Sequence, residues 1–156
     1  MSVVRTATPA DLDAAAAMAE ARRVRYEAFE PVFWKRQPGS EALSRAWFAH
    51  LLARPETVFL VAEWGGSPTG FLIAVPTPAP PVYEAGPTAM IDDFCVEDPA
   101  LWASVGPPLL REARARLKER GFRQIVVISG AKDTEKKTFL AAEKLSPAST
   151  WWTAPA

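Results

Sequence analysis

Residues 92–121 read DDFCVEDPALWASVGPPLLREARARLKERG, and this stretch decides how the rest of the chain is interpreted. Two carboxylates stand in a β-prone run that leads to Val96, and a loop then reaches Gly106. From Gly106 to Arg120 apolar residues recur at helical spacing, which predicts an amphipathic helix that Gly121 ends. A strand, a tight turn and a helix N-terminus together form a natural phosphate site beside a place for chemistry.

The chain of 156 residues has the composition of a single globular domain, which we expect to span residues 1–156. Lys and Arg total 18, as do Asp and Glu, so the net charge gives no reason to expect nucleic acid as a partner. The single cysteine, Cys95, excludes an internal disulfide and a cysteine-rich zinc site, and we predict no metal. No apolar run approaches the ~20 residues of a membrane span and no signal peptide is recognisable, so we expect a cytoplasmic protein without a membrane partner.

The first half of the chain predicts a strand over residues 2–6, helices over residues 8–23 and 40–54, and a loop or broken helix over residues 29–38. The second helix carries apolar residues at helical spacing, namely Leu43, Trp47, Phe48, Leu51 and Leu52. Residues 57–64 and 69–75 then predict a β-hairpin. The proline-rich residues 76–87 cannot be regular structure; they are either a flap on the substrate side or a passive connection.

The second half predicts a strand over residues 88–96, the helix over residues 106–120, and a strand over residues 124–128. The last of these is continuously apolar and β-branched, which is typical of a strand buried on both faces of a parallel sheet. A final helix over residues 133–144 directs three side chains inward, those of Phe139, Leu140 and Leu145. Residues 150–153, with two tryptophans, can add a last strand.

This order of elements resembles the GNAT superfamily of acyl-CoA-dependent N-acetyltransferases over almost the whole chain. Residues 92–96 look like the family's acidic fourth strand, and Glu143-Lys144-Leu145 is similar to its Tyr-Glu-Lys-Leu-Gly-Phe ending. The resemblance implies an α/β (α+β) fold, with a mixed central sheet of six to seven strands flanked by about four helices. It also implies acetyl-CoA as co-substrate and direct transfer, in a ternary complex, to a small-molecule amine or a peptide N-terminus.

The family's phosphate turn, Arg/Gln-x-x-Gly-x-Gly/Ala, aligns with residues 101–106, where only Gly106 matches in type. The resemblance makes this turn cofactor-binding through five residues: Trp102, Ala103, Ser104, Val105 and Gly106. Pro107 and Pro108 remove two N–H donors from the expected first turn of the helix, which would weaken CoA binding by about 1–3 kcal/mol. Arg111 and Arg114 either compensate for this loss or are simply solvated.

On the fourth strand, the resemblance implies that a backbone N–H near Phe94, Cys95 or Val96 holds the thioester carbonyl. Asp92 is the first candidate for the catalytic base and Asp93 the second. Adjacent strand residues face opposite sides, so only one carboxylate can face a substrate, and the other should pair within the fold. The alternative is that both make only ordinary hydrogen bonds.

Where the family often has a tyrosine that protonates the departing thiolate, this chain has Ala142. A thiolate leaves tolerably well without an acid, so slower or differently assisted transfer is expected. For the other polar candidates we favour roles outside catalysis. Cys95 is either an acylated nucleophile or, as we favour, a small buried hydrophobe, and His50 is favoured as a structural or surface residue over a base. Lys132, Lys136 and Lys137 either meet a nucleotide 3′-phosphate or, as we favour, form a solvated face.

Two functions therefore stay open at the level of sequence. One is a GNAT-type N-acetyltransferase. The other is a GNAT-like fold that has lost transfer and survives as a binding or dimerisation module. The Trp151-Trp152 pair, on what we expect to be an edge strand, is compatible with a homodimer in either case.

Overall fold

The computed structural model describes residues 2–156. Its elements follow one another as β1 (Val3–Thr6), η1 (Pro9–Asp11), α1 (Leu12–Phe29), α2 (Ser40–Leu52), β2 (Val58–Trp64), β3 (Ser67–Thr77), β4 (Thr88–Ile91), β5 (Phe94–Val96), η2 (Pro99–Leu101), α3 (Trp102–Glu119), β6 (Gln124–Val127) and α4 (Thr134–Ala142). Within these residues, no helix combines the length and apolar character needed to span a bilayer.

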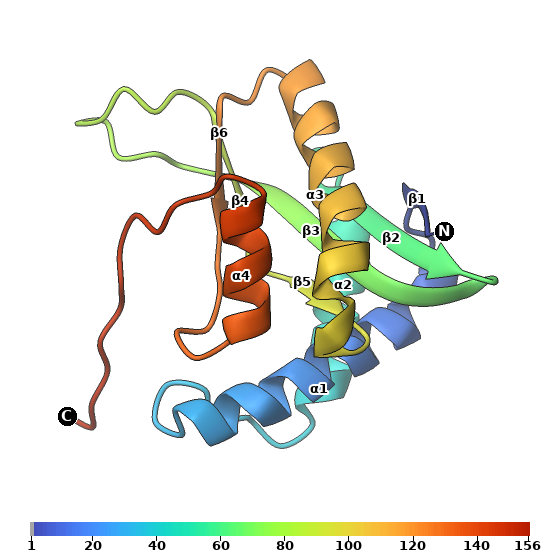
Figure 1. Ribbon diagram of the computed structural model, residues 1–156, viewed down its shortest axis with the longest axis vertical. Coiled ribbons are helices and arrows are strands. Elements are labelled where there is room, and N and C mark those ends of the chain that lie inside the picture. Colours follow the sequence, from blue (N-terminus) through green and yellow to red (C-terminus); the bar gives the residue numbers. More distant parts are fainter. Residues whose placement is uncertain (1) are drawn as a thin grey trace.

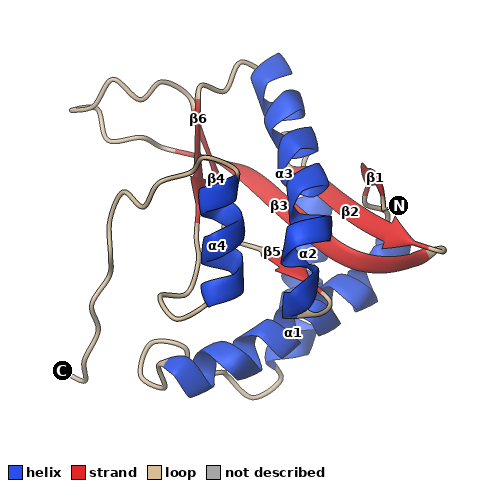
Figure 2. Cartoon of the chain, viewed as in Figure 1, coloured by secondary structure: helices blue, strands red, loops and turns tan. Residues whose placement is uncertain are grey.

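The six strands form one mixed sheet in the order β1-β2-β3-β4-β6, with β5 also paired to β3 (Figure 1). All pairings are antiparallel except that of β4 with β6, which is parallel. This arrangement, with four α-helices around the sheet, confirms the predicted fold class (Figure 2). It also confirms the predicted parallel unit of strand, helix and strand around α3.

Two apolar clusters cover the two faces of the sheet. Leu60 and Leu72 belong to a cluster that includes the buried side chains of α3 and α4, whereas Phe59 and Phe71 belong to one that includes those of α1 and α2. Successive side chains of a strand point to opposite faces, so neighbouring residues of β2 and β3 pack against different helix layers. The sheet is therefore the middle layer between two pairs of helices.

β1 and the hairpin of β2 and β3 form where the sequence predicts them, with bounds shifted by one or two residues, and α2 starts at Ser40 as predicted. Two side chains of α2 do not face the core as predicted, because Leu43 and Trp47 are exposed while Phe48 and Leu51 carry the packing. The first helix is longer than predicted and ends at Phe29.

The start of α3 differs from the prediction. The helical region begins at η2 and continues as α3 from Trp102, so residues 101–106 form the end of one helical segment and the beginning of the next, not a tight turn. Asp98 explains the earlier start, because its side chain accepts a hydrogen bond from the Ala100 N–H and Pro99 takes the first helical position. Pro107 and Pro108 therefore lie inside α3, not in its first turn.

The sheet edge beyond β4 also differs from the prediction. The outer side of β6 pairs with no strand of residues 2–156, and its residues alternate between exposed and half-buried, so it is not buried on both faces. The predicted strand over residues 150–153 does not form, and Trp151 and Trp152 are 79% and 94% exposed. A strand needs a partner edge, and this tail runs away from β6 in Figure 1.

Candidate functional site

A β-bulge interrupts the strand that the sequence predicts over residues 88–96. β3 pairs with β4 as far as Val75↔Met90 and with β5 from Leu72↔Phe94. Two residues of β3 thus oppose the three residues Ile91, Asp92 and Asp93 on the other strand. One extra residue bends a strand away from its neighbour, which accounts for β5 leaving the sheet edge that β4 shares with β6.

The bulge leaves one side of β5 without a neighbouring strand. The carbonyl oxygen of Asp93 and the N–H of Glu97 bond to β3, and Cys95 stands opposite Phe71 in the same register. Because hydrogen bonding alternates along an antiparallel strand, the N–H and C=O groups of Phe94 and Val96 point away from β3. β5 therefore presents an outward-facing row of backbone donors and acceptors, which we call the β5 edge.

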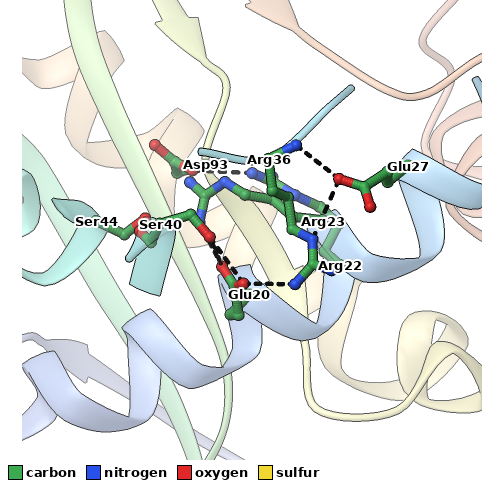
Figure 3. Close-up of polar contacts among 8 residues, drawn as sticks. All are labelled: Glu20, Arg22, Arg23, Glu27, Arg36, Ser40, Ser44 and Asp93. Carbon is green, nitrogen blue, oxygen red and sulfur yellow. Dashed lines mark hydrogen bonds and ion pairs between the residues drawn. The ribbon is translucent and has the colours of Figure 1, made fainter. Parts of the chain in front are cut away.

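The two adjacent carboxylates have different environments. Arg22 of α1 donates to the Asp92 carbonyl oxygen and to Asp93 Oδ1, each at 3.1 Å, and forms an ion pair with Asp93 (Figure 3). One of the two carboxylates, that of Asp93, is thus paired within the fold, as predicted from the alternation of side chains along a strand. The Asp92 carboxylate is exposed and makes no hydrogen bond or ion pair with residues 2–156.

The pKa of the Asp92 carboxyl lies above its ordinary value. Desolvation by the surrounding chain is the main cause, and the neighbouring negative charge of Asp93 acts in the same direction. A carboxylate with a raised pKa binds a proton more strongly than an ordinary aspartate, which suits a group that accepts one from a substrate.

Lys136 of α4 is buried against the β5 edge, which contradicts its assignment to a solvated face. Its side chain is 1% exposed, and Nζ donates to the Phe94 carbonyl oxygen at 3.1 Å. The nitrogen lies 5.5 Å from the centre of the Phe94 ring and 5.3 Å from that of Trp102. Burial lowers the pKa of Lys136 to about 8, and the positive charge of Arg22 contributes to this effect.

Three aromatic rings fill the space between β5, α3 and α4. Trp102 stacks on Phe139 with ring centres 5.3 Å apart, and both rings meet Phe94 edge-on. The Nε1 atom of Trp102 is buried and has no hydrogen-bond partner in residues 2–156. Buried N–H donors are rarely left unpaired, so this atom marks a place where an acceptor is missing.

The remaining residues of the expected phosphate turn divide between core and surface. Val105 and Gly106 are buried, and a Cβ added at Gly106 would lie 2.9 Å from the Phe139 ring, so this glycine allows α3 and α4 to approach. Ala103 and Ser104 are exposed on the first turn of α3. The carboxylate of Asp98 already occupies the start of the helical region.

Tyr26 of α1 is hydrogen-bonded to the loop before α4. Its hydroxyl donates to Asp133 Oδ2 at 2.5 Å and accepts the Gly130 N–H at 3.2 Å. Asp133 also accepts the Lys136 N–H, which caps α4. Burial raises the pKa of Tyr26, and the hydrogen bond to Asp133 raises it further. The ring thus fixes the loop that leads into Lys136.

The other polar candidates take the roles that their sequence context favoured. Cys95 is buried, and burial raises the pKa of its thiol. His50 is exposed and stacks on Trp47, with ring centres 5.3 Å apart. Lys132 and Lys137 are exposed, and Arg111 forms an exposed bidentate pair with Glu143.

A polar depression of about 390 Å³ lies between α1 and the segment that leads into α2. Glu20 accepts from Ser40 Oγ and from Arg36, and Glu27 accepts from the Arg36 backbone and side chain. Figure 3 shows this network beside the Arg22–Asp93 ion pair; Glu20, Arg22 and Glu27 all come from α1. The proline-rich residues 78–87 do not line this depression; they lead into the first residue of β4. The four residues of β4, which span about 13 Å, therefore separate this loop from Asp92.

No cluster of three or more metal-ligating side chains is found in residues 2–156. A model of the acetyltransferase (GNAT) family matches residues 17–142. A comparison with curated proteins gives no match.

Several solved structures share the fold. A predicted acetyltransferase with acetyl-CoA from Clostridium acetobutylicum is 14% identical, with a TM-score of 0.73 over 99% of this chain and 96% of that chain. A GCN5-related N-acetyltransferase from Ralstonia eutropha is 20% identical, with a TM-score of 0.74 over 100% and 99%. A variant of a Bacillus halodurans protein is 15% identical, with a TM-score of 0.84 over 99% of both chains.

Proposed function

Because the chain belongs to the acetyltransferase (GNAT) family, we propose that it transfers the acetyl group of acetyl-CoA to the nitrogen of a small-molecule amine or a peptide N-terminus. The observation that carries this proposal is the β5 edge, which the bulge opens at Phe94 and Val96. Such an edge can pair with the amides of a pantetheine chain as it would with a neighbouring strand.

The residues around the β5 edge fit the thioester end of acetyl-CoA. The backbone N–H groups of Phe94 and Val96 and the Val96 carbonyl oxygen point away from β3, while the Phe94 carbonyl oxygen already accepts from Lys136 Nζ. Trp102 Nε1 is a buried donor that lacks an acceptor. These groups would hold the donor molecule, and acetyl-CoA supplies an activated carbonyl carbon there. N–H groups aimed at a carbonyl oxygen stabilise the negative charge that develops on it.

The start of α3 fits the phosphate end less well. Ala103 and Ser104 are exposed on its first turn and are the residues that would meet the pyrophosphate. Asp98, however, places a carboxylate at the end of the helix dipole that attracts anions. We therefore expect acetyl-CoA to bind mainly through its pantetheine end, and weakly.

We assign proton transfer to Asp92 and positioning to Asp93. The exposed Asp92 carboxylate, with its raised pKa, accepts the proton of the attacking ammonium. The Arg22–Asp93 ion pair holds the bulge in place and keeps the second carboxylate turned into the fold. The polar depression beside α1 is our proposed approach for the amine, since Glu20 and Glu27 line it.

The test begins with calorimetric titrations of acetyl-CoA and CoA into the protein, followed by thiol release with a panel of small amines and short peptides. Binding together with release that depends on an added amine would support the proposal. Absence of binding at millimolar acetyl-CoA would contradict it.

A second candidate is a module of the same fold that binds without transferring. Two observations favour it. Lys136 Nζ already donates a hydrogen bond to the Phe94 carbonyl oxygen, and the Asp98 carboxylate already accepts the Ala100 N–H at the start of the helical region. Binding of acetyl-CoA with no thiol release from any amine would support this alternative.

Homodimer formation stays a prediction for either function. The exposed Trp151 and Trp152 are candidates for a contact between copies. Sedimentation analysis of the wild type and of a variant carrying Trp151→Ser and Trp152→Ser tests it, because only the wild type should dimerise.

A further inference from the structure

Lys136 is an unusual residue for this position. Its side chain is 1% exposed, yet no carboxylate in residues 2–156 forms an ion pair with Nζ. Lysine is rarely buried without a partner, because an ammonium group loses its hydration there. A role beyond packing would account for keeping a lysine at this place.

The position of the nitrogen is equally specific. Nζ reaches the carbonyl oxygen of Phe94, on the β5 edge, at 3.1 Å. It also lies 5.3 Å from the centre of the Trp102 ring, whose N–H lacks an acceptor. A nucleophilic nitrogen therefore lies over the ring that carries the unpaired donor, at the edge to which we assign the thioester.

We propose that Lys136 is itself an acyl acceptor, and that its side chain becomes acetylated by the thioester bound along the β5 edge. This inference rests on the proposed function, because it requires an acyl thioester at that edge. It adds a modification site within the protein to a transferase whose ordinary acceptor is an external amine.

The reaction balances without a further reagent. Lys136 Nζ, in its neutral form, attacks the thioester carbonyl carbon and a C–N bond forms. The C–S bond breaks, and the thiolate departs with the electron pair. The nitrogen loses one proton, which the thiolate takes up directly or through solvent. The products are an Nε-acetyl-lysine and a free thiol.

The product suits the surroundings of Lys136 better than an ammonium does. An amide carries no charge, so its burial against the Phe94 and Trp102 rings costs less. Its N–H can still donate to the Phe94 carbonyl oxygen. An amide is stable, so the modification accumulates to one group per chain.

Reactivity at neutral pH is also favoured. Burial lowers the pKa of Lys136 to about 8. The neutral fraction at neutral pH is then on the order of 100-fold larger than that of an ordinary lysine. Lys132 and Lys137 lie on the same segment but are exposed, which makes them matched internal controls.

The experiment incubates the wild-type protein with acetyl-CoA and no amine, and follows intact mass and peptide mapping over time. We expect one added acetyl group, on Lys136, at least about tenfold faster than on Lys132 or Lys137. Acetic anhydride serves as a comparison, because it should modify the exposed lysines first and Lys136 last. Labelling of Lys136 no faster than the exposed lysines would overturn the proposal.

Variants confirm the site. Lys136→Arg keeps a cation that can bond Phe94 but should abolish the acetyl-CoA label, whereas Lys137→Arg should keep it. Trp102→Phe should slow labelling, because it removes the unpaired donor. A label that survives Lys136→Arg would overturn the assignment. The wild-type map decides the question even if a variant fails to fold.

The proposed function and this inference fail in different ways. Amine-dependent thiol release without a label on Lys136 would overturn the inference and leave the transferase intact. Absence of acetyl-CoA binding in calorimetry would overturn both.

Discussion

Arg22 and Asp93 form an ion pair of 3.1 Å between α1 and the bulge that separates β4 from β5. The same guanidinium also bonds the Asp92 carbonyl oxygen, so a single side chain holds both bulge residues. The pair joins the helix layer of α1 to the strand whose edge is the candidate site. Because Arg22 pairs with Asp93, the carboxylate that stays free is that of Asp92.

Replacing Arg22 should destabilise the fold. Arg22→Met would leave Asp93 unpaired with its side chain only 15% exposed, and breaking such a pair costs about 3 kcal/mol. The matched control is Arg45→Met, which removes an exposed pair with Asp13 and should change the free energy of unfolding by less than about 0.5 kcal/mol. Urea unfolding measures both, and equal losses would contradict the role of Arg22.

Asp92→Asn should reduce amine transfer and leave the fold intact. Removing a general base costs about 10²-fold or more in rate. The raised pKa of Asp92 means that the folded state favours the protonated carboxyl, so stability falls as pH rises from the ordinary value through the raised one. The variant should therefore be at least as stable as the wild type at neutral pH.

The pH profile of transfer checks the same assignment. The active form of Asp92 is the carboxylate, so the rate should rise with pH through the raised pKa, above the ordinary value of 3.8. Glu84→Gln, an exposed change in the proline-rich loop, should leave the profile unchanged. Full activity in Asp92→Asn would remove the assignment of the base.

Tyr26→Phe should loosen the loop before α4. The variant loses the bonds to Asp133 and Gly130, which should lower the free energy of unfolding by about 1–3 kcal/mol. Tyr83→Phe is the control, because Tyr83 is exposed and should tolerate the change. Hydrogen exchange of the loop amides should increase in Tyr26→Phe alone; protection equal to that of the wild type would refute a clamping role.

Asp98→Asn should strengthen acetyl-CoA binding. Asparagine caps a helix as well as aspartate does, so the bond to Ala100 can persist while the negative charge is lost. Removing one like charge at a helix start should tighten binding by about two- to fivefold at low salt. Calorimetry measures the change with Glu84→Gln as control, and weaker binding would show that the start of the helical region does not meet the phosphates.

Periodicity in the sequence was sufficient for most of the fold. The β2–β3 hairpin, the start of α2 and the inward face of α3 follow from apolar spacing and turn residues alone. The bulge could not be predicted, because the strand pattern of residues 88–96 continues through Asp92 and Asp93, and a register shift depends on the partner strand. The exposure of β6 depends likewise on a neighbour that is absent from residues 2–156.

The site was only half visible in the sequence. The acidic pair indicated the strand on which we propose the site, but Arg22 and Tyr26 lie far from it in the chain and carried no signal. Two other features were visible in the sequence, but each pointed against the interpretation that we favoured there. Asp98-Pro99 is a regular helix start that competes with a turn at residues 101–106, and Lys136 stands three residues before the buried Phe139, on the inward face of α4.

The most direct test of the account is a nuclear magnetic resonance titration of the protein with acetyl-CoA. The β5 edge predicts that the backbone amides of Phe94 and Val96 and the indole N–H of Trp102 shift together, with Trp102→Phe assigning the indole signal. The exposed indoles of Trp151 and Trp152 should stay unchanged. Shifts confined to those exposed indoles, or no shifts at millimolar ligand, would contradict an acyl donor held along β5.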